Sequence, residues 1–182
     1  MEVLKTEFPG LCLIKPKIFN DERGFFYESY HFDKFKLQGI DIVFKQDNHS
    51  RSERGTIRGL HFQKGSAAQT KLVRCVVGEI YDVVVDLRRN SPTFGRWAGY
   101  KLSAENKQQL LVPQGFAHGF SVLSEHAEFL YKCDNYYSPQ DERGIIWNDA
   151  GLAIDWLVKD PIISAKDNKL PLFKELPADD LY

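Results

Sequence analysis

TIRGLHFQ (residues 56–63) and TKLVR (residues 70–74) are two strand-like runs separated by a loop of Gly, Ser and Ala residues. They place a histidine, His61, and a lysine, Lys71, on neighbouring strand-like segments. Side chains alternate between the two faces of a strand, so Lys71 shares a face with the small apolar residues Val73 and Cys75. A charged ammonium group is costly among apolar neighbours unless an anion lies close by. Lys71 is therefore either a strand-end lysine that reaches water or part of a functional site.

Gly59 complicates the alternation around His61. A glycine inside a strand often marks a bulge or the close approach of another backbone. Such an irregularity would let the side chains of both Arg58 and His61 point into the same cavity. A histidine that stands alone is more often a core residue bonded to a backbone carbonyl, so the interpretation of His61 depends on its neighbours.

The rest of the chain contains many short strand-like runs separated by Gly, Pro, Asn and Asp. We expect a hairpin around the turn at 20–24, a short helix at 32–37 closed by Gly39, a polar loop at 50–55, and another short helix around 164–168. Further strands are expected at 80–87, 97–102, 110–112, 116–123 and 128–134. This pattern predicts an all-β sandwich or jelly roll with only a few short helices.

The composition limits the size and the class of the protein. With 182 residues, the chain is expected to form one domain over residues 1–182. Lys and Arg total 24 against 25 Asp and Glu, so no general basic surface for nucleic acid is expected. Cys12, Cys75 and Cys133 are widely spaced and indicate reduced thiols in a cytoplasmic protein. Neither a signal peptide nor a membrane span is expected.

PQGFAH (residues 113–118), which ends at His118, fits one half of the cupin sequence pattern. In this respect the chain resembles the metal-binding jelly rolls. The other half is missing, because Phe62 and Gln63 follow His61 and no glutamate lies between Gln63 and Arg74. Two histidines without a third protein ligand make a poor zinc or iron site. His49 would need an unusual reach to complete it. We therefore expect a cupin-type jelly roll without a bound metal.

Without a metal, the available groups suit removal of a proton next to a carbonyl. His61 can act as the base, and a lysine in a dry pocket, Lys71, can stabilise the enolate oxygen. Tyr131 can return a proton from the opposite face, although an inward tyrosine is more often a packing residue. Asp82 lies between valines in a strand-like run and is a further candidate for a supporting carboxylate.

The chain resembles the dTDP-4-dehydrorhamnose 3,5-epimerases of the dTDP-rhamnose pathway nearly from end to end. Six motifs in family order carry the resemblance: DERGFFYE (21–28), QDNHS (46–50), GTIRGLHFQ (55–63), KLVR (71–74), VPQGFAHGF (112–120) and SAKD (164–167). Six ordered motifs at family spacing are far more specific than any one of them.

The resemblance implies a cofactor-free epimerase that inverts dTDP-4-dehydro-6-deoxy-D-glucose at carbons 3 and 5 through enolates. His61 would be the base, Asp167 its orienting partner, Lys71 the enolate stabiliser and Tyr131 the acid. A homodimer is implied, in which N-terminal strands supply Arg23 and Glu28 to the partner's site. Substrate contacts are implied for Arg23, Glu28, Gln46, Asn48, Arg58, Lys71, His118, Glu142 and Lys166. Arg23 and Arg58 suit the diphosphate, because a guanidinium fork matches phosphate oxygens.

Three alternatives remain open on the sequence. The first is an epimerase that acts at carbon 3 or carbon 5 only, or a ketoisomerase built on the same site. The second is a non-catalytic jelly roll that binds nucleotide sugars, which would have no use for a base and an acid on opposite walls. The third is a metal-dependent cupin oxygenase.

Overall fold

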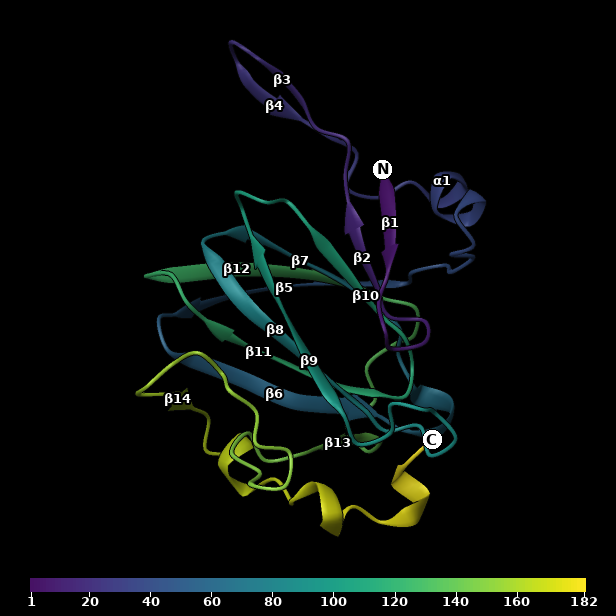
Figure 1. Cartoon of the computed structure of the whole chain (residues 1–182), viewed down its shortest axis with the longest axis vertical. Helices are drawn as coiled ribbons and strands as arrows, with labels where there is room; N and C mark the ends of the chain where they lie inside the picture. The colour runs from purple at the N-terminus through teal and green to yellow at the C-terminus, as the bar shows by residue number, and fades with distance from the viewer.

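Two packed β-sheets form the body of the molecule in the computed structural model, which describes residues 1–182 (Figure 1). The first sheet contains, in spatial order, β1 (Glu2–Lys5), β2 (Cys12–Lys15), β10 (Gln109–Val112), β7 (Lys71–Val77), β12 (His126–Cys133) and β5 (Gln46–Glu53). The second contains β13 (Glu142–Gly144), β6 (Thr56–Gln63), β11 (Phe116–Val122), β8 (Glu79–Asp86) and β9 (Trp97–Ser103), with β14 (Ile162–Ile163) parallel to β6. The predicted all-β jelly roll is confirmed.

The main core fills one part of the space between the sheets. Alternation along β8 sends Ile80 and Val84 inward, where they pack with Val73 and Phe129 of the first sheet. The opposite face of β8 carries Val83 and packs against the C-terminal segment, which runs beneath the second sheet in Figure 1. Because both faces of β8 are covered, this strand is apolar on both sides, apart from Glu79 at its start, Asp82 and Asp86.

The outer face of the first sheet is covered by the predicted short helix, α1 (Phe32–Leu37). Phe35 packs on Ile14 and Leu72 in a separate small core. Gly39 has a φ of 83°, a left-handed conformation in which glycine is favoured, and it follows the helix end as predicted. None of the helices has the length and apolar character that a membrane crossing requires.

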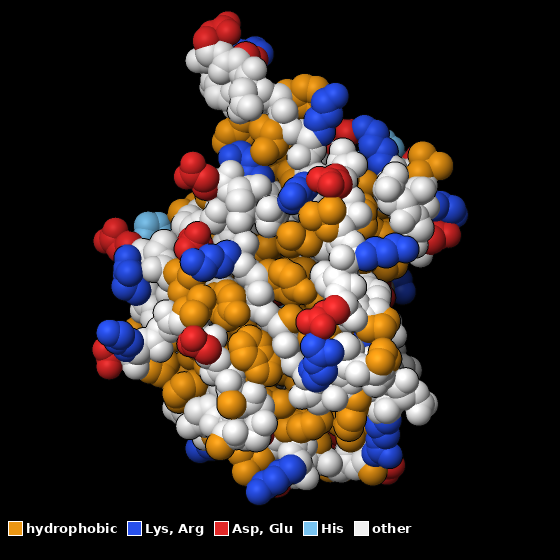
Figure 2. Space-filling view, viewed as in Figure 1, with side chains coloured by type: hydrophobic (Ala, Val, Ile, Leu, Met, Phe, Trp, Pro, Cys, Tyr) orange, Lys and Arg blue, Asp and Glu red, His pale blue; other side chains and the backbone are white.

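A two-stranded hairpin, β3 (Phe19–Asp21) and β4 (Gly24–Phe26), projects from the body of the molecule. Figure 2 shows apolar side chains gathered where it joins the body. Phe25 and Phe26 are 59% and 66% exposed, unusual values for large aromatic side chains. The predicted hairpin is confirmed around its turn, and the preceding strand, Cys12–Lys15, is not part of it but pairs with β1 and β10.

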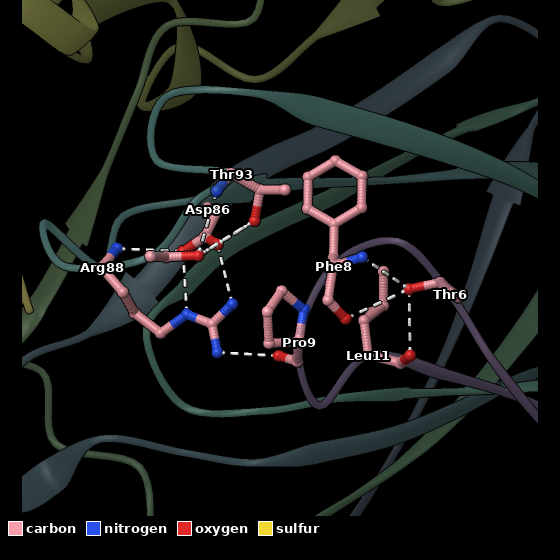
Figure 3. Close-up of polar contacts among 8 residues, drawn as sticks. Thr6, Phe8, Pro9, Leu11, Asp86, Arg88 and Thr93 are labelled. Atoms are coloured by element: carbon pink, nitrogen blue, oxygen red, sulfur yellow. Dashed lines mark hydrogen bonds and ion pairs between the residues drawn. The ribbon is translucent and has the colours of Figure 1, made fainter.

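A buried carboxylate fixes the N-terminal loop to the end of β8 (Figure 3). Asp86 accepts hydrogen bonds from the guanidinium of Arg88 at 2.8 and 2.7 Å and from the hydroxyl of Thr93 at 2.6 Å. Arg88 also donates to the carbonyl of Pro9 at 2.8 Å. These bonds link residues 86–93 to the N-terminal loop, which is far from them in sequence.

Two of the predicted elements are wrong. Residues 50–53 are not a polar loop, because β5 continues to Glu53 and pairs with β12 along its whole length. The segment 164–168 is not an α-helix: β14 ends at Ile163, and a single 3-10 turn follows, η2 (Asp167–Lys169). The remaining 3-10 turns are η1 (Gly65–Ala67), η3 (Phe173–Glu175) and η4 (Ala178–Asp180).

Candidate active site

A cavity of about 500 Å³ lies between the two sheets beside the main core. The second sheet contributes His61 from β6 and His118 from β11, and the first sheet contributes Lys71 from β7 and Tyr131 from β12. The expectation that His61 and Lys71 lie on neighbouring strands is therefore wrong in detail. They belong to different sheets and line opposite walls of one cavity.

The irregularity predicted at Gly59 is present. Ile57 and Leu60 both pack outward against the C-terminal segment, whereas Arg58 and His61 both line the cavity, so the strict alternation is broken between them. A Cβ on Gly59 would lie 2.6 Å from the Cα of Gly119 on β11, a distance that no side chain tolerates. Glycine at this position thus allows the close backbone approach that turns both functional side chains inward.

His61 is paired with Asp167, as the resemblance implied. Its Nε2 lies 2.9 Å from Oδ1 of Asp167, and the other carboxylate oxygen accepts the backbone N–H of Gly59 at 3.2 Å. Burial alone would raise the pKa of Asp167, but the hydrogen bond and charge of His61 outweigh it and lower that pKa. Asp167 is therefore ionised at neutral pH and accepts the Nε2 hydrogen, which leaves Nδ1 as the ring atom that can take up a proton.

Glu142 lies on the other side of His61, with Oε1 3.5 Å from Nδ1. Its second oxygen accepts hydrogen bonds from Lys166 and from the Tyr137 hydroxyl, the latter at 2.8 Å. Burial opposes ionisation of Glu142, yet these two donors lower its pKa. The group is thus an anion held between the proposed base and a lysine at the cavity wall.

Lys71 and Tyr131 face His61 from the first sheet. Burial lowers the pKa of Lys71, while the nearby Cys133, Asp82 and Glu142 act in the opposite direction. Burial raises the pKa of Tyr131, so its phenol keeps its proton at neutral pH. The Tyr131 ring packs 5.6 Å from that of Phe129, and the ammonium of Lys71 lies 6.0 Å from the Tyr131 ring centre. The ammonium and the phenol therefore share one wall.

His118 is the register partner of His61 across β6 and β11, so the two imidazoles are neighbours. Its Nε2 lies 2.9 Å from each oxygen of Asp82. Two histidine–carboxylate pairs thus stand side by side on the second sheet.

A second cavity of about 280 Å³ adjoins the first and shares His61, Lys71 and Tyr131 with it. The predicted substrate contacts divide between the two cavities. Arg58, His118 and Lys166 line the first, whereas Gln46, Asn48 and Glu142 line the second. Residues that could act on a sugar therefore lie at the junction of two compartments.

Arg23 and Glu28 are not brought to either cavity within one chain. Arg23 lies at the tip of the hairpin with its side chain 84% exposed and pairs with Asp21. Glu28 pairs with Lys34.

Sequence reasoning missed Tyr137, which lines the second cavity and donates to Glu142. The sequence shows there only two adjacent tyrosines, Tyr136 and Tyr137, which do not reveal the contact with Glu142. It also missed Ser52, whose hydroxyl accepts a 2.9 Å hydrogen bond from Nε of Arg58 and fixes that side chain at the cavity wall.

No group of three or more His, Cys, Asp or Glu side chains is arranged so that it could hold a metal ion. One ring nitrogen of His61 and one of His118 are each bonded to a carboxylate instead. The side chains present offer a base with its orienting carboxylate, a buried ammonium group and a protonated phenol.

Comparison with known proteins gives consistent results. A family model described as dTDP-4-dehydrorhamnose 3,5-epimerase matches residues 5–175. The chain is 56% identical over 177 residues to the dTDP-4-dehydrorhamnose 3,5-epimerase of Salmonella typhimurium, covering 96% of this chain and 97% of that protein.

Two solved structures are also closely similar. One is the dTDP-6-deoxy-D-glucose-3,5-epimerase of Legionella pneumophila in complex with dTDP-4-keto-L-rhamnose, with a TM-score of 0.94, 48% identity, and coverage of 99% of this chain and 96% of that chain. The other is the dTDP-4-dehydrorhamnose 3,5-epimerase of Bacillus anthracis with TDP and PPi bound, with a TM-score of 0.92, 54% identity, and coverage of 94% and 99%.

Proposed function

This chain belongs to the dTDP-4-dehydrorhamnose 3,5-epimerase family, and we propose that it converts dTDP-4-dehydro-6-deoxy-D-glucose to dTDP-4-dehydro-L-rhamnose by inverting carbons 3 and 5. The observation that carries this proposal is the pairing of His61 with Asp167 at 2.9 Å, opposite the phenol of Tyr131 and the ammonium of Lys71. A binding module would have no use for an oriented base and an acid on facing walls.

The proposed chemistry is a proton removal followed by a proton return at each carbon. Carbons 3 and 5 flank the carbon-4 ketone, so loss of either proton gives an enolate whose charge rests on the ketone oxygen. Nδ1 of His61 takes the proton, and the Lys71 ammonium stabilises the oxygen. Tyr131 returns a proton from the opposite wall, which inverts the carbon, and proton exchange with water then restores His61 and Tyr131 for the next step. One proton leaves and one arrives, so the reaction needs no redox cofactor.

Binding of the nucleotide is assigned to the remaining predicted contacts. Arg58 and Lys166 carry positive charge at the wall of the first cavity and suit the diphosphate. Gln46, Asn48 and Glu142 line the adjoining cavity, where amide and carboxylate groups can bind the rest of the nucleotide.

We propose a homodimer in which the hairpin of one subunit completes the site of the other. Arg23 and Glu28 lie outside both cavities of their own chain, and the hairpin exposes Phe25 and Phe26. Large exposed aromatic side chains on a projecting element are typical of a surface that is covered in an assembly. We further propose that residues 1–182 act as one domain and that the enzyme works in the cytoplasm, in keeping with three free cysteines.

The test is incubation of the protein with dTDP-4-dehydro-6-deoxy-D-glucose in deuterated water, with the products followed by NMR. The proposal predicts deuterium at both carbon 3 and carbon 5 and formation of the L-sugar. Label at one carbon alone would identify a mono-epimerase. Absence of label together with tight binding would identify a non-catalytic binding protein.

A further inference from the structure

Asp82 is a buried carboxyl group at the site for which the proposed chemistry has no role. It lies on the inward face of β8, between Ile80 and Val84 on the same face, and has no exposed surface. Burial raises its pKa, while His118 and then Lys71 act against that rise. A carboxyl group in this position is costly compared with an aliphatic side chain. The presence of Asp82 among valines therefore suggests that its carboxyl group has a function.

The contact with Asp82 decides which ring atom of His118 faces the cavity. Both oxygens of Asp82 lie 2.9 Å from Nε2. No buried side-chain nitrogen or oxygen in the molecule lacks a partner. Because Nδ1 of His118 has no protein partner and the residue lines the cavity, Nδ1 must be open to that cavity.

The position of Nδ1 suits the ketone oxygen of the substrate. His118 is the register partner of the proposed base, His61, and Lys71 lines the same cavity from the opposite sheet. Besides Glu142, the acidic groups that influence Lys71 are Asp82 and Cys133. Burial raises the pKa of the Cys133 thiol to about 11, so this group is neutral at neutral pH. Asp82 is thus the carboxyl group that both Lys71 and His118 share.

We propose that Asp82 is a positioning residue: it holds His118 by Nε2 so that Nδ1–H points into the cavity and, together with Lys71, binds the ketone oxygen that becomes the enolate. This role, which rests on the function proposed above, adds a second donor to the single ammonium group. Two donors aimed at a developing oxyanion stabilise it more than one.

The proton count of the pair is consistent with this role. When Asp82 and His118 together hold two ionisable protons, one is shared between the carboxyl group and Nε2, and the other is on Nδ1. The pair is then neutral overall, whichever partner carries the shared proton. The Nδ1 hydrogen is not transferred in the reaction, so the pair needs no regeneration after turnover.

The first experiment is a double-mutant cycle with Asp82→Asn and His118→Asn. Each single change should lower kcat about 100-fold with little change in KM, since each removes one properly aimed donor. The double variant should be no slower than His118→Asn alone, because Asp82 acts only through His118. Losses that multiply in the double variant, or an Asp82→Asn variant with wild-type kcat, would overturn the proposal.

Asp86→Asn is the matched control. Asp86 lies on the same face of the same strand and is equally buried, but it bonds to Arg88 and Thr93 away from the cavity. Assayed at a temperature at which the variant remains folded, Asp86→Asn should retain wild-type kcat. If Asp86→Asn lost as much kcat as Asp82→Asn, both losses would be explained by general destabilisation, and the proposal would be contradicted.

A spectroscopic measurement covers the case in which Asp82→Asn does not fold. In the wild-type protein, two-bond ¹H–¹⁵N correlations of the His118 ring near neutral pH should show a hydrogen on Nδ1. A ring whose Nδ1 carries no hydrogen would refute the proposal. This readout needs no substrate, so its failure can be told apart from failure of the proposed function, which is judged by whether the wild-type protein puts deuterium at both carbon 3 and carbon 5.

Discussion

His61 lies between two carboxylates, and each contacts a different nitrogen of its ring. Asp167, 2.9 Å from Nε2, is anchored in turn by the N–H of Gly59, so it fixes the orientation of the ring. Glu142 is 3.5 Å from Nδ1 and is already bonded to Lys166 and Tyr137. The atom proposed to remove the proton is therefore the one with the looser contact, as a base that must reach its substrate requires.

Asp167→Ala should slow turnover without weakening substrate binding. The imidazole would lose the partner that sets its tautomer, and kcat should fall by about 10² to 10⁴. Steady-state kinetics would measure kcat and KM, and a calorimetric titration with dTDP would check binding. An unchanged kcat would remove Asp167 from the mechanism.

Lys71 should set the alkaline limit of activity. Burial lowers its pKa below the 10.5 of an ordinary lysine, and the charged ammonium is the form proposed to act. Activity should therefore be present below that lowered pKa and be lost as the pH rises through it. Burial raises the pKa of Tyr131 above 10.0, so a limb caused by ionisation of its phenol would lie on the alkaline side of that value. In a kcat–pH profile, Lys71→Met should be slow and lack the limb, and a variant that keeps it would contradict the assignment.

The sequence predicted that Arg58, His61 and Lys71 point inward, but it did not predict their arrangement. Alternation correctly predicted an inward Lys71, and Gly59 correctly predicted that Arg58 and His61 share a cavity. Local periodicity contains no information about which sheet a strand joins, so the placement of His61 and Lys71 on opposite walls could not be foreseen. The contact between Tyr137 and Glu142 joins a loop to an edge strand, and no local pattern signals such a pair.

The strands were predictable where at least one face is apolar, as in β8 and β12. β5 shows the limit, because QDNHSRSE is polar on both faces and its second half was predicted to be a loop. It pairs with β12 on one side and lies at the edge of the first sheet, where polar side chains can face water. The segment 164–168 does not form the predicted α-helix, because the helical pattern there is too short to outweigh the bonds of Asp167 to His61 and Gly59 of β6.

The bonds of Asp86 give the end of β8 a stability that depends on pH. Burial alone would raise its pKa, but the hydrogen bonds from Arg88, Ser91 and Thr93 lower it from 3.8 to about 2. Since the folded-state pKa is the lower one, this contribution is complete above pH 3.8 and disappears as the pH falls through about 2. The shift corresponds to about 2 kcal/mol of unfolding free energy at neutral pH.

Asp86→Asn should therefore unfold more easily at pH 7 by about 2 kcal/mol or more. Between pH 4 and pH 2, the difference from wild type should shrink. Urea unfolding at several pH values would measure both effects. A difference that stays constant across this range would show that the carboxylate charge is not responsible.

At the scale of the whole molecule, each of the two sheets carries a different part of the proposed catalytic machinery. The second sheet carries the base and its carboxylate, and the first carries the ammonium and the phenol. The hairpin stands apart from both and holds Arg23 far from its own cavity. The motif that contains Arg23 was predicted to be part of the site, yet it lies outside the cavity of its own chain. A site completed by the hairpin of a second subunit would explain this.

Complementation tests this exchange. Arg23→Glu and His61→Asn should each be nearly inactive alone. Mixed and refolded together in equal amounts, they should regain about one quarter of wild-type activity, because half of the dimers are mixed and each has one intact site. If the mixture is no more active than its parts, Arg23 does not act across the dimer.

Deuterium incorporation by His61→Asn tests the central claim most directly, namely that one imidazole on the second sheet removes the protons and the phenol opposite returns them. Wild type and the variants His61→Asn and Tyr131→Phe would be incubated with the substrate in deuterated water, and label at carbons 3 and 5 would be followed by NMR. The account predicts that His61→Asn introduces no label at either carbon, whereas Tyr131→Phe still exchanges protons but forms little of the inverted product. Label entering at the wild-type rate in His61→Asn would contradict it.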